Sequence, residues 1–177
     1  RISQDMSVLL RFSVEISQIT DSEKLQEVLL ERLFEIVPVE QGVILLGTDI
    51  DQLFLGSPVH RQKPPADKLI RVSRTVVTQV FVSGQSLLRN DLLGDAPSES
   101  IVAAGLQSVI CVSLAVMNNR IGVVYLATTN PGGRFDERHL ELITAIAGIA
   151  SPALEHVRYV EWLETENRQL IHQVNLQ

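Results

Sequence analysis

Two apolar runs separated by three residues constrain the fold of this chain more than any other feature. Residues 108–116 and 120–129 are rich in valine, isoleucine and leucine, which favour strands. Met117, Asn118 and Asn119 lie between them, and because asparagine tolerates positive φ, the sequence predicts a tight hairpin. Neither run alternates cleanly between apolar and polar residues, so both faces of the sheet should be covered. The chain is therefore expected to fold in layers.

Capping residues predict two helices in the first half of the chain. Thr20 followed by Glu23 forms a capping box, and Pro38 ends the apolar stripe that follows, which predicts a helix over residues 21–37. Ser73 is a good N-cap and Gly84 a good left-handed C-cap. These two residues predict a second helix over residues 74–83.

The final helix is predicted to begin at Asp136, which is a suitable N-cap. Pro152 lies inside this helix and removes one backbone donor, so we expect a kink or a short break near Gly148.

Three further apolar runs, residues 41–48, 53–60 and 86–90, are bounded by turn-forming residues and predict strands. The resulting order is helix, helix, two strands, helix, three strands, helix. This order predicts an α+β fold with a central antiparallel sheet. The N- and C-terminal helices should cover one face, and a helix-and-loop layer with a cavity beneath it should cover the other.

Helical spacing at both ends of the chain predicts a dimer seam. Near the C-terminus, alternating three- and four-residue steps select Val160, Leu163, Asn167, Leu170 and Val174. A lone asparagine at an a-type position favours two-stranded, in-register pairing, so two copies should lie parallel. The same spacing near the N-terminus selects Ile2, Met6, Leu9, Ser13 and Ile16. The alternative is that both helices pack on their own domain, because a convincing coiled coil needs about three or four heptads.

Composition narrows the class of protein. At 177 residues the chain fits one domain, and folding should bury roughly 70% of its surface. The net charge is −6 and the basic residues are scattered, which argues against direct nucleic-acid binding. The single Cys111 excludes an internal disulfide and fits a reducing compartment. With neither a signal peptide nor an uninterrupted membrane-length apolar segment in the sequence, we expect a cytoplasmic protein that binds no membrane.

The sequence shows no catalytic or metal-binding motif. His60, His139, His156 and His172 stand far apart without metal-ligand spacing. Neither a G-x-S-x-G nucleophile elbow nor a G-x-x-x-x-G-K-[ST] phosphate loop is present. We therefore expect neither an enzyme nor a metal centre. Cys111 could sense oxidation if it were exposed, but a mid-strand cysteine among apolar neighbours is more often an inert core residue.

The order and spacing of these elements resemble the GAF family of small-molecule sensor domains. The likeness is carried by residues 40–46 (EQGVILL), 72–77 (VSRTVV), 108–114 (SVICVSL) and 121–126 (IGVVYL), followed by Phe135 and the helix after it. It spans most of the chain, residues 7–160. The sequence is most similar to the GAF domains that lie between a forkhead-associated domain and the AAA+ motor of sigma-54-dependent bacterial transcription activators. Glu164, Glu166, Asn167, Arg168 and Leu170 look like the linker helix that enters such a motor.

The resemblance implies three regions: an N-terminal dimerisation helix (1–18), a GAF sensor domain (19–158) and a C-terminal coiled-coil linker helix (159–177). It implies a homodimeric regulatory module that binds an unknown small-molecule effector, with no cofactor identified. Its terminal helices would pass the signal to an AAA+ domain downstream in the same chain. The alternatives are a ligand-free dimerisation scaffold and a cyclic-nucleotide-binding GAF domain.

The sequence departs from the family at several positions. Many GAF domains have proline where Ser113 stands and an acidic residue where Ala127 stands. The cyclic-nucleotide motif is absent in its proper spacing, because Pro131 follows Asn130 where that motif has lysine. Cys111 has no histidine neighbour, so covalent attachment of a bilin is not expected. A methionine-sulfoxide reductase of the GAF type needs several cysteines, which one cysteine nearly excludes.

The predicted ligand pocket lies between the sheet and residues 71–104. We expect apolar walls with a few polar groups. The candidate ligand-binding residues are Ser73, Thr75, Asp91, Asp95, Ser108 and Cys111. The candidate dimer residues are Leu9, Ile16, Val160, Leu163, Asn167, Leu170 and Val174.

Overall fold

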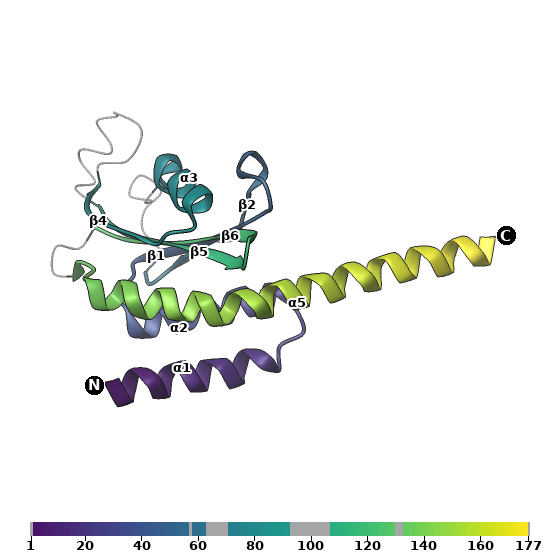
Figure 1. Ribbon diagram of the computed structural model, residues 1–177, viewed down its shortest axis with the longest axis horizontal. Helices are drawn as coiled ribbons and strands as arrows, with labels where there is room; N and C mark the ends of the chain where they lie inside the picture. Colours follow the sequence, from purple (N-terminus) through teal and green to yellow (C-terminus); the bar gives the residue numbers. More distant parts are fainter. Residues whose placement is uncertain (1, 57, 63–70, 93–106, 130–132, 177) are drawn as a thin grey trace.

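The computed structural model describes residues 2–56, 58–62, 71–92, 107–129 and 133–176. In chain order the elements are helices α1 (Ile2–Ser17) and α2 (Ser22–Ile36), strand β1 (Gln41–Leu46), the 3-10 turn η1 (Ile50–Gln52), strands β2 (Phe54–Leu55) and β3 (Val59–His60), helix α3 (Arg74–Ser83), strands β4 (Leu87–Leu92), β5 (Gln107–Val116) and β6 (Asn119–Thr128), and helix α5 (Glu137–Leu176) (Figure 1).

The strands form one antiparallel sheet in the order β2-β1-β6-β5-β4, with β3 also pairing to β1. Helices α1, α2 and α5 lie on one face of this sheet and α3 lies on the other (Figure 1). The predicted α+β sandwich is therefore confirmed. Both faces are apolar: β1 is buried along its whole length, and β6 from Ile121 onward.

Alternation along the strands divides the core into two clusters. In β5, Ile110 and Leu114 face the layer of α1, α2 and α5, whereas Val109 and Cys111 face α3. The larger cluster includes residues of all three helices on its side of the sheet. The smaller cluster lies under α3 and is centred on Tyr125.

The predicted β5–β6 hairpin is confirmed, but its strained residue is not an asparagine. Val116 pairs with Asn119, which leaves Met117 and Asn118 as the turn. Met117 takes the positive φ of 54°, and its side chain is 97% exposed. The ladder register places Asn119 in β6, and Asn118, which stays in the turn, does not take a positive φ.

The predicted strand over residues 53–60 is wrong, because two separate short strands pair with β1. Leu55 pairs with Leu45, and Val59 pairs with Gly42, so the register shifts by one residue between the two pieces. Pro58 lies in this interval and has no amide hydrogen to offer a ladder. The other predicted strands agree with the observed ones to within two residues.

Helix caps follow the sequence at α3 but not at α2. Ser73 Oγ accepts the amide hydrogen of Val76 at 3.3 Å, and Gly84 has φ of 73°, as predicted. At α2 the N-cap is Asp21, whose carboxylate accepts the amide hydrogen of Glu23 at 3.1 Å. The capping box predicted from Thr20 is therefore wrong by one residue, since a local carboxylate caps the helix instead.

Helix α5 runs unbroken through Pro152, so a break near Gly148 is absent, and the alternative of a kink stays a prediction. Pro152 has no amide hydrogen to donate to the carbonyl of Gly148, four residues earlier. Gly148 is exposed, so water can donate to that oxygen instead. By length and composition α5 could span a membrane, but 44% of its most apolar window is buried against the domain. A core helix passes the same test.

We expect two glycine substitutions to have opposite effects on stability. A Cβ added at Gly122 would lie 2.0 Å from the backbone oxygen of Leu45, so Gly122→Ala should lower the free energy of unfolding by about 2 kcal/mol or more. Gly148 has no such neighbour within 4 Å, so Gly148→Ala should raise the free energy of unfolding by roughly 0.5–1 kcal/mol through helix propensity. Urea unfolding of both variants measures the difference. Equal stabilities would contradict the tight β1–β6 contact.

Candidate functional site

The predicted ligand face is the sheet surface under α3. Val43, Val109 and Ala127 project from three adjacent strands and are almost completely buried. Val76, Val80 and Phe81 of α3 pack in the same cluster. Residues 93–104 of the predicted pocket wall lie outside the described residues, so the predicted cavity stays a prediction.

Tyr125 ties the sheet to the start of α3. Among the described residues it is the largest fully buried side chain, and its hydroxyl accepts the backbone amide hydrogen of Ser73 at 3.2 Å. Ser73 is itself buried and caps α3, so this predicted ligand residue has a structural role at the N-terminus of the helix. Sequence reasoning missed Tyr125. A phenol inside the apolar run of β6 was the signal that could have identified it.

The other predicted ligand residues do not share one surface. Cys111 is buried on the α3 side, and burial raises the pKa of its thiol. Ser108 lies three residues earlier in the same strand and faces the opposite layer, where its hydroxyl accepts the amide hydrogen of Phe135 at 3.1 Å and donates to Asn90 at 2.6 Å. The structure thus corrects the prediction that Ser108 and Cys111 line one pocket. Thr75 is exposed on α3.

The two predicted aspartates cannot be placed as side chains. Asp91 belongs to strand β4, but the position of its side chain lies outside what the structure describes. Asp95 falls within residues 93–106, which are also outside the described ranges. Ligand contact by either residue stays a prediction.

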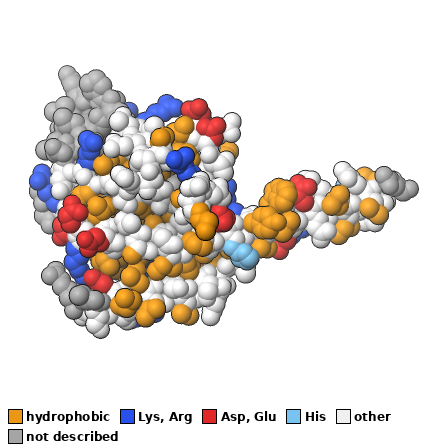
Figure 2. Space-filling view, in the orientation of Figure 1, with side chains coloured by type: hydrophobic (Ala, Val, Ile, Leu, Met, Phe, Trp, Pro, Cys, Tyr) orange, Lys and Arg blue, Asp and Glu red, His pale blue; other side chains and the backbone are white. Residues whose placement is uncertain are grey.

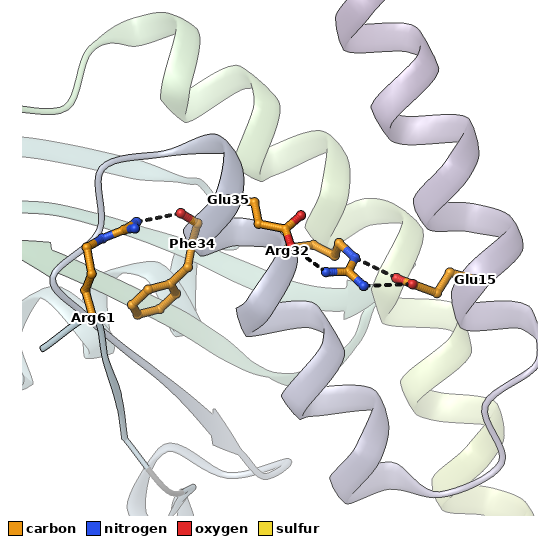
Figure 3. A network of polar contacts seen from close by, with 5 residues as sticks. All are labelled: Glu15, Arg32, Phe34, Glu35 and Arg61. Atoms are coloured by element: carbon orange, nitrogen blue, oxygen red, sulfur yellow. Dashed lines mark hydrogen bonds and ion pairs between the residues drawn. The ribbon is translucent and has the colours of Figure 1, made fainter.

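A polar cluster that the sequence did not indicate holds the end of the sheet next to α2. The Arg61 guanidinium donates to the backbone oxygen of Phe34 at 2.5 Å and lies over the Phe34 ring (Figure 3). It also donates to the backbone oxygen of Val39 at 2.9 Å. Glu40 accepts two hydrogen bonds from Thr129, at 2.8 and 3.0 Å. Through its hydrogen bonds Arg61 caps the C-terminus of α2. Its partners lie 22 to 27 residues earlier in the chain, so no local sequence pattern predicts this cap.

Helices α1 and α2 are joined by an ion pair. Arg32 donates two hydrogen bonds of 2.9 Å to the carboxylate of Glu15 and contacts Glu35 at 2.8 Å (Figure 3). The hydrogen bond from Arg32 lowers the pKa of Glu15, and the same bond raises the pKa of Arg32. Both groups are therefore charged at neutral pH. Their bidentate geometry fixes how α1 lies on α2.

The residues of the predicted N-terminal seam are divided between two faces of α1. Ile16 is 3% exposed and packs in the core of its own domain, as does Phe12, and Leu9 packs against the same cluster. This corrects the assignment of Ile16 to a seam between two copies. The helical spacing of Leu9 and Ile16 therefore reflects the contact of α1 with its own domain. Met6 is exposed, and with Leu10 and Val14 it forms an apolar stripe.

A groove follows the exposed stripe of α1. Its volume is about 1100 Å³, and the C-terminal half of α2 forms its other wall, with Ile36 among the lining residues. Apolar side chains supply much of its lining, with the Glu15–Arg32 ion pair at one position. This face of the helical layer therefore presents a hollow surface.

The last part of α5 extends beyond the domain as an arm, residues 158–176 (Figures 1 and 2). Val157 is the last buried residue of the helix. Val160 is half-buried, and Asn167 is exposed. Leu163, Leu170 and Val174 are 43%, 59% and 70% exposed. From Leu163 onward the predicted C-terminal seam thus lies on an exposed surface, whereas the domain partly covers Val160. Among the described residues, no group of three or more His, Cys, Asp or Glu side chains could hold a metal ion.

Three solved structures share this architecture at low sequence identity. A free methionine-R-sulfoxide reductase from Neisseria meningitidis, in complex with its substrate, has a TM-score of 0.65 and 21% identity, covering 88% of this chain and 91% of that one. The GAF domain of a phosphoenolpyruvate-protein phosphotransferase from Coxiella burnetii has a TM-score of 0.67 and 11% identity, with coverages of 89% and 96%. A segment of a methyl-accepting chemotaxis protein has a TM-score of 0.63 and 19% identity, with coverages of 84% and 98%. These similarities show the fold alone.

Sequence comparison identifies the family. A search of curated proteins gave no match. The family model for the GAF domain, in contrast, matches residues 20–155, which is most of the chain and includes every strand described above. The chain therefore belongs to the GAF domain family.

Proposed function

We propose that this chain is a regulatory small-molecule sensor and dimerisation module that passes its signal through α5. The observation that carries the proposal is the continuity of that helix. Ile146 and Leu154 of α5 are fully buried against the sheet, and the same unbroken helix continues into the exposed arm. A rigid helix that is anchored in the core at one end and exposed at the other can transmit a change in packing.

The sensor surface of the proposal is the sheet under α3. GAF domains serve as sensor and signalling modules, and the Neisseria neighbour with this fold is in complex with its substrate. In this chain, α3 is anchored at its N-terminus by the Tyr125–Ser73 hydrogen bond. A small molecule held near this point would alter how α3 packs on β6, which lies directly between β1 and β5.

We further propose a sigma-54-dependent bacterial transcription regulator as the host of this domain. The support is the sequence of the arm, where Glu164, Glu166 and Arg168 resemble the linker into an AAA+ motor. The proposed setting is a cytoplasmic homodimer with an AAA+ domain downstream in the same chain. The segment itself would bind neither nucleic acid nor membrane.

The proposed role is not enzymatic. Cys111 is the only cysteine of the chain, it is fully buried, and burial raises the pKa of its thiol. A thiolate reductase mechanism needs an accessible thiolate with a lowered pKa. The chemistry of this cysteine is therefore that of a small core residue.

A ligand-free dimerisation scaffold is the second candidate. It is favoured by the apolar packing under α3, where Val76, Val80 and Phe81 already contact the sheet cluster. The two candidates share the exposed arm and differ only in whether a small molecule binds.

Thermal-shift screening against a panel of small metabolites separates these candidates. A ligand present at a hundredfold excess over its Kd should add about 2.7 kcal/mol to the free energy of unfolding. A chain truncated after Val157 is the control, because it keeps the sheet and α3 and should show the same shift. If no compound in a broad panel shifts the transition of either chain, the scaffold is the better description.

The dimer is tested by changing the seam of the arm. Asn167→Leu should strengthen association while loosening control of register, because the buried-amide penalty that disfavours other arrangements is removed. Gln169→Leu is the matched control, since it makes a similar change two residues away, off the seam, and should not strengthen association. Truncation after Val157 should weaken it. Sedimentation equilibrium measures all four chains.

Two outcomes would contradict the parallel dimer. One is a monomer at micromolar concentration for both the intact and the truncated chain. The other is an antiparallel arrangement, shown by the absence of cross-links between single cysteines placed at Val174 in two copies that do associate.

A further inference from the structure

The point where α5 leaves the domain carries one specific polar contact. Beyond Val157 the packing of α5 thins, Val160 and Glu161 are half-buried, and the described residues from Trp162 onward are exposed. Glu161 is therefore placed at the base of the arm.

The carboxylate of Glu161 caps the N-terminus of α2. Its Oε1 accepts the backbone amide hydrogen of Ser22 at 2.7 Å, and its Oε2 accepts the hydroxyl hydrogen of Ser22 at 3.2 Å. Ser22 is the first residue of α2, where amide groups have no acceptor inside the helix and a negative charge is favourable. Asp21 supplies a local cap to Glu23, so this helix end receives two carboxylates, one of them from 139 residues away.

We propose that Glu161 is a positioning residue that latches the base of the arm to α2, so that the direction of the arm follows the position of α2. This inference rests on the proposed function, in which the arm is the output. The inference assigns the coupling between the sheet and the arm to α2, although α1 also packs on α5.

Helix α2 contacts the sheet directly, so a displacement of a strand would move it. A Cβ added at Gly42 of β1 would lie 2.8 Å from the Phe34 ring and 3.2 Å from Leu30, so side chains of α2 rest directly on the backbone of this strand. The neighbouring residue in β1, Val43, faces α3 on the other side of the sheet. A displacement of β1 therefore reaches α2 through direct contact, and reaches the arm through Glu161.

The chain contains a natural probe for the latch. Trp162 is its only tryptophan, it follows Glu161 directly, and it is 57% exposed and stacked on Tyr159 at 6.1 Å between ring centroids. Fluorescence of the intact chain thus reports on the base of the arm without a label.

The first experiment removes the latch. In Glu161→Ala, the amides of the first turn of α2 should exchange with solvent about fivefold to tenfold faster, because one cap is lost. The anisotropy of Trp162 should decay faster in the same variant, and Glu161→Gln, which keeps one acceptor oxygen, should fall between it and the wild type. Glu164→Gln is the control, because it removes the same charge from an exposed position on the arm.

The second experiment displaces α2 and reads the arm. Gly42→Ala should push α2 from β1 and shift the Trp162 emission, and the shift should vanish when Glu161→Ala is added. Where Gly42→Ala does not fold, Phe34→Leu changes the same contact more mildly and takes its place.

The latch is overturned if Glu161→Ala matches Glu164→Gln in both exchange and anisotropy, or if the Gly42→Ala shift survives without Glu161. Sedimentation of the same variants keeps the two proposals apart. A monomeric chain whose α2 amides still respond to Glu161→Ala would overturn the dimer and keep the latch. A dimer in which neither the α2 amide exchange nor the Trp162 anisotropy responds to Glu161→Ala would overturn the latch and keep the dimer.

Discussion

Burial of β6 on both faces is the constraint on which the rest of the structure depends. β6 lies between β1 and β5, and its residues from Ile121 to Thr128 are buried. Each face of such a strand needs its own cover, so α2 and α5 must occupy one side and α3 the other. Gly122 allows β1 to approach closely, because any side chain there would meet the Leu45 backbone. The course of α5, and with it the exit point of the arm, follows from this arrangement.

Local signals predicted much of the fold, and long-range contacts account for the remainder. The sequence predicted the caps at Ser73 and Gly84 and the long strands β5 and β6, because propensity, capping and tertiary packing agree there. The short strands β2 and β3 were not, since their register depends on β1 and on the interruption at Pro58. The caps supplied by Arg61 and Glu161 come from distant parts of the chain, so no sequence window contains both donor and acceptor.

The candidate ligand site was predicted less well, and one error was avoidable. Ser108 and Cys111 are an odd number of residues apart in one strand, so strand alternation alone places them on opposite faces. Tyr125, whose position has the same parity as Val123 and Ala127, belongs to the α3 face and contacts the helix cap directly. The side chains of Asp91 and Asp95 lie outside the described part of the chain.

Spacing by itself could not decide which seam residues face a partner, because a heptad-like pattern fits either a helix of the same chain or one of another. Burial separates the two cases: Ile16 is in the core, whereas Leu170 is exposed. Fully burying a leucine or valine side chain contributes about 1.5–3 kcal/mol, while association costs roughly 4–15 kcal/mol. The seam side chains of the arm are already partly buried in one copy, so pairing two heptads of arm alone leaves little net free energy for association. A stable dimer of this domain would therefore also cover the stripe of Met6, Leu10 and Val14 on α1.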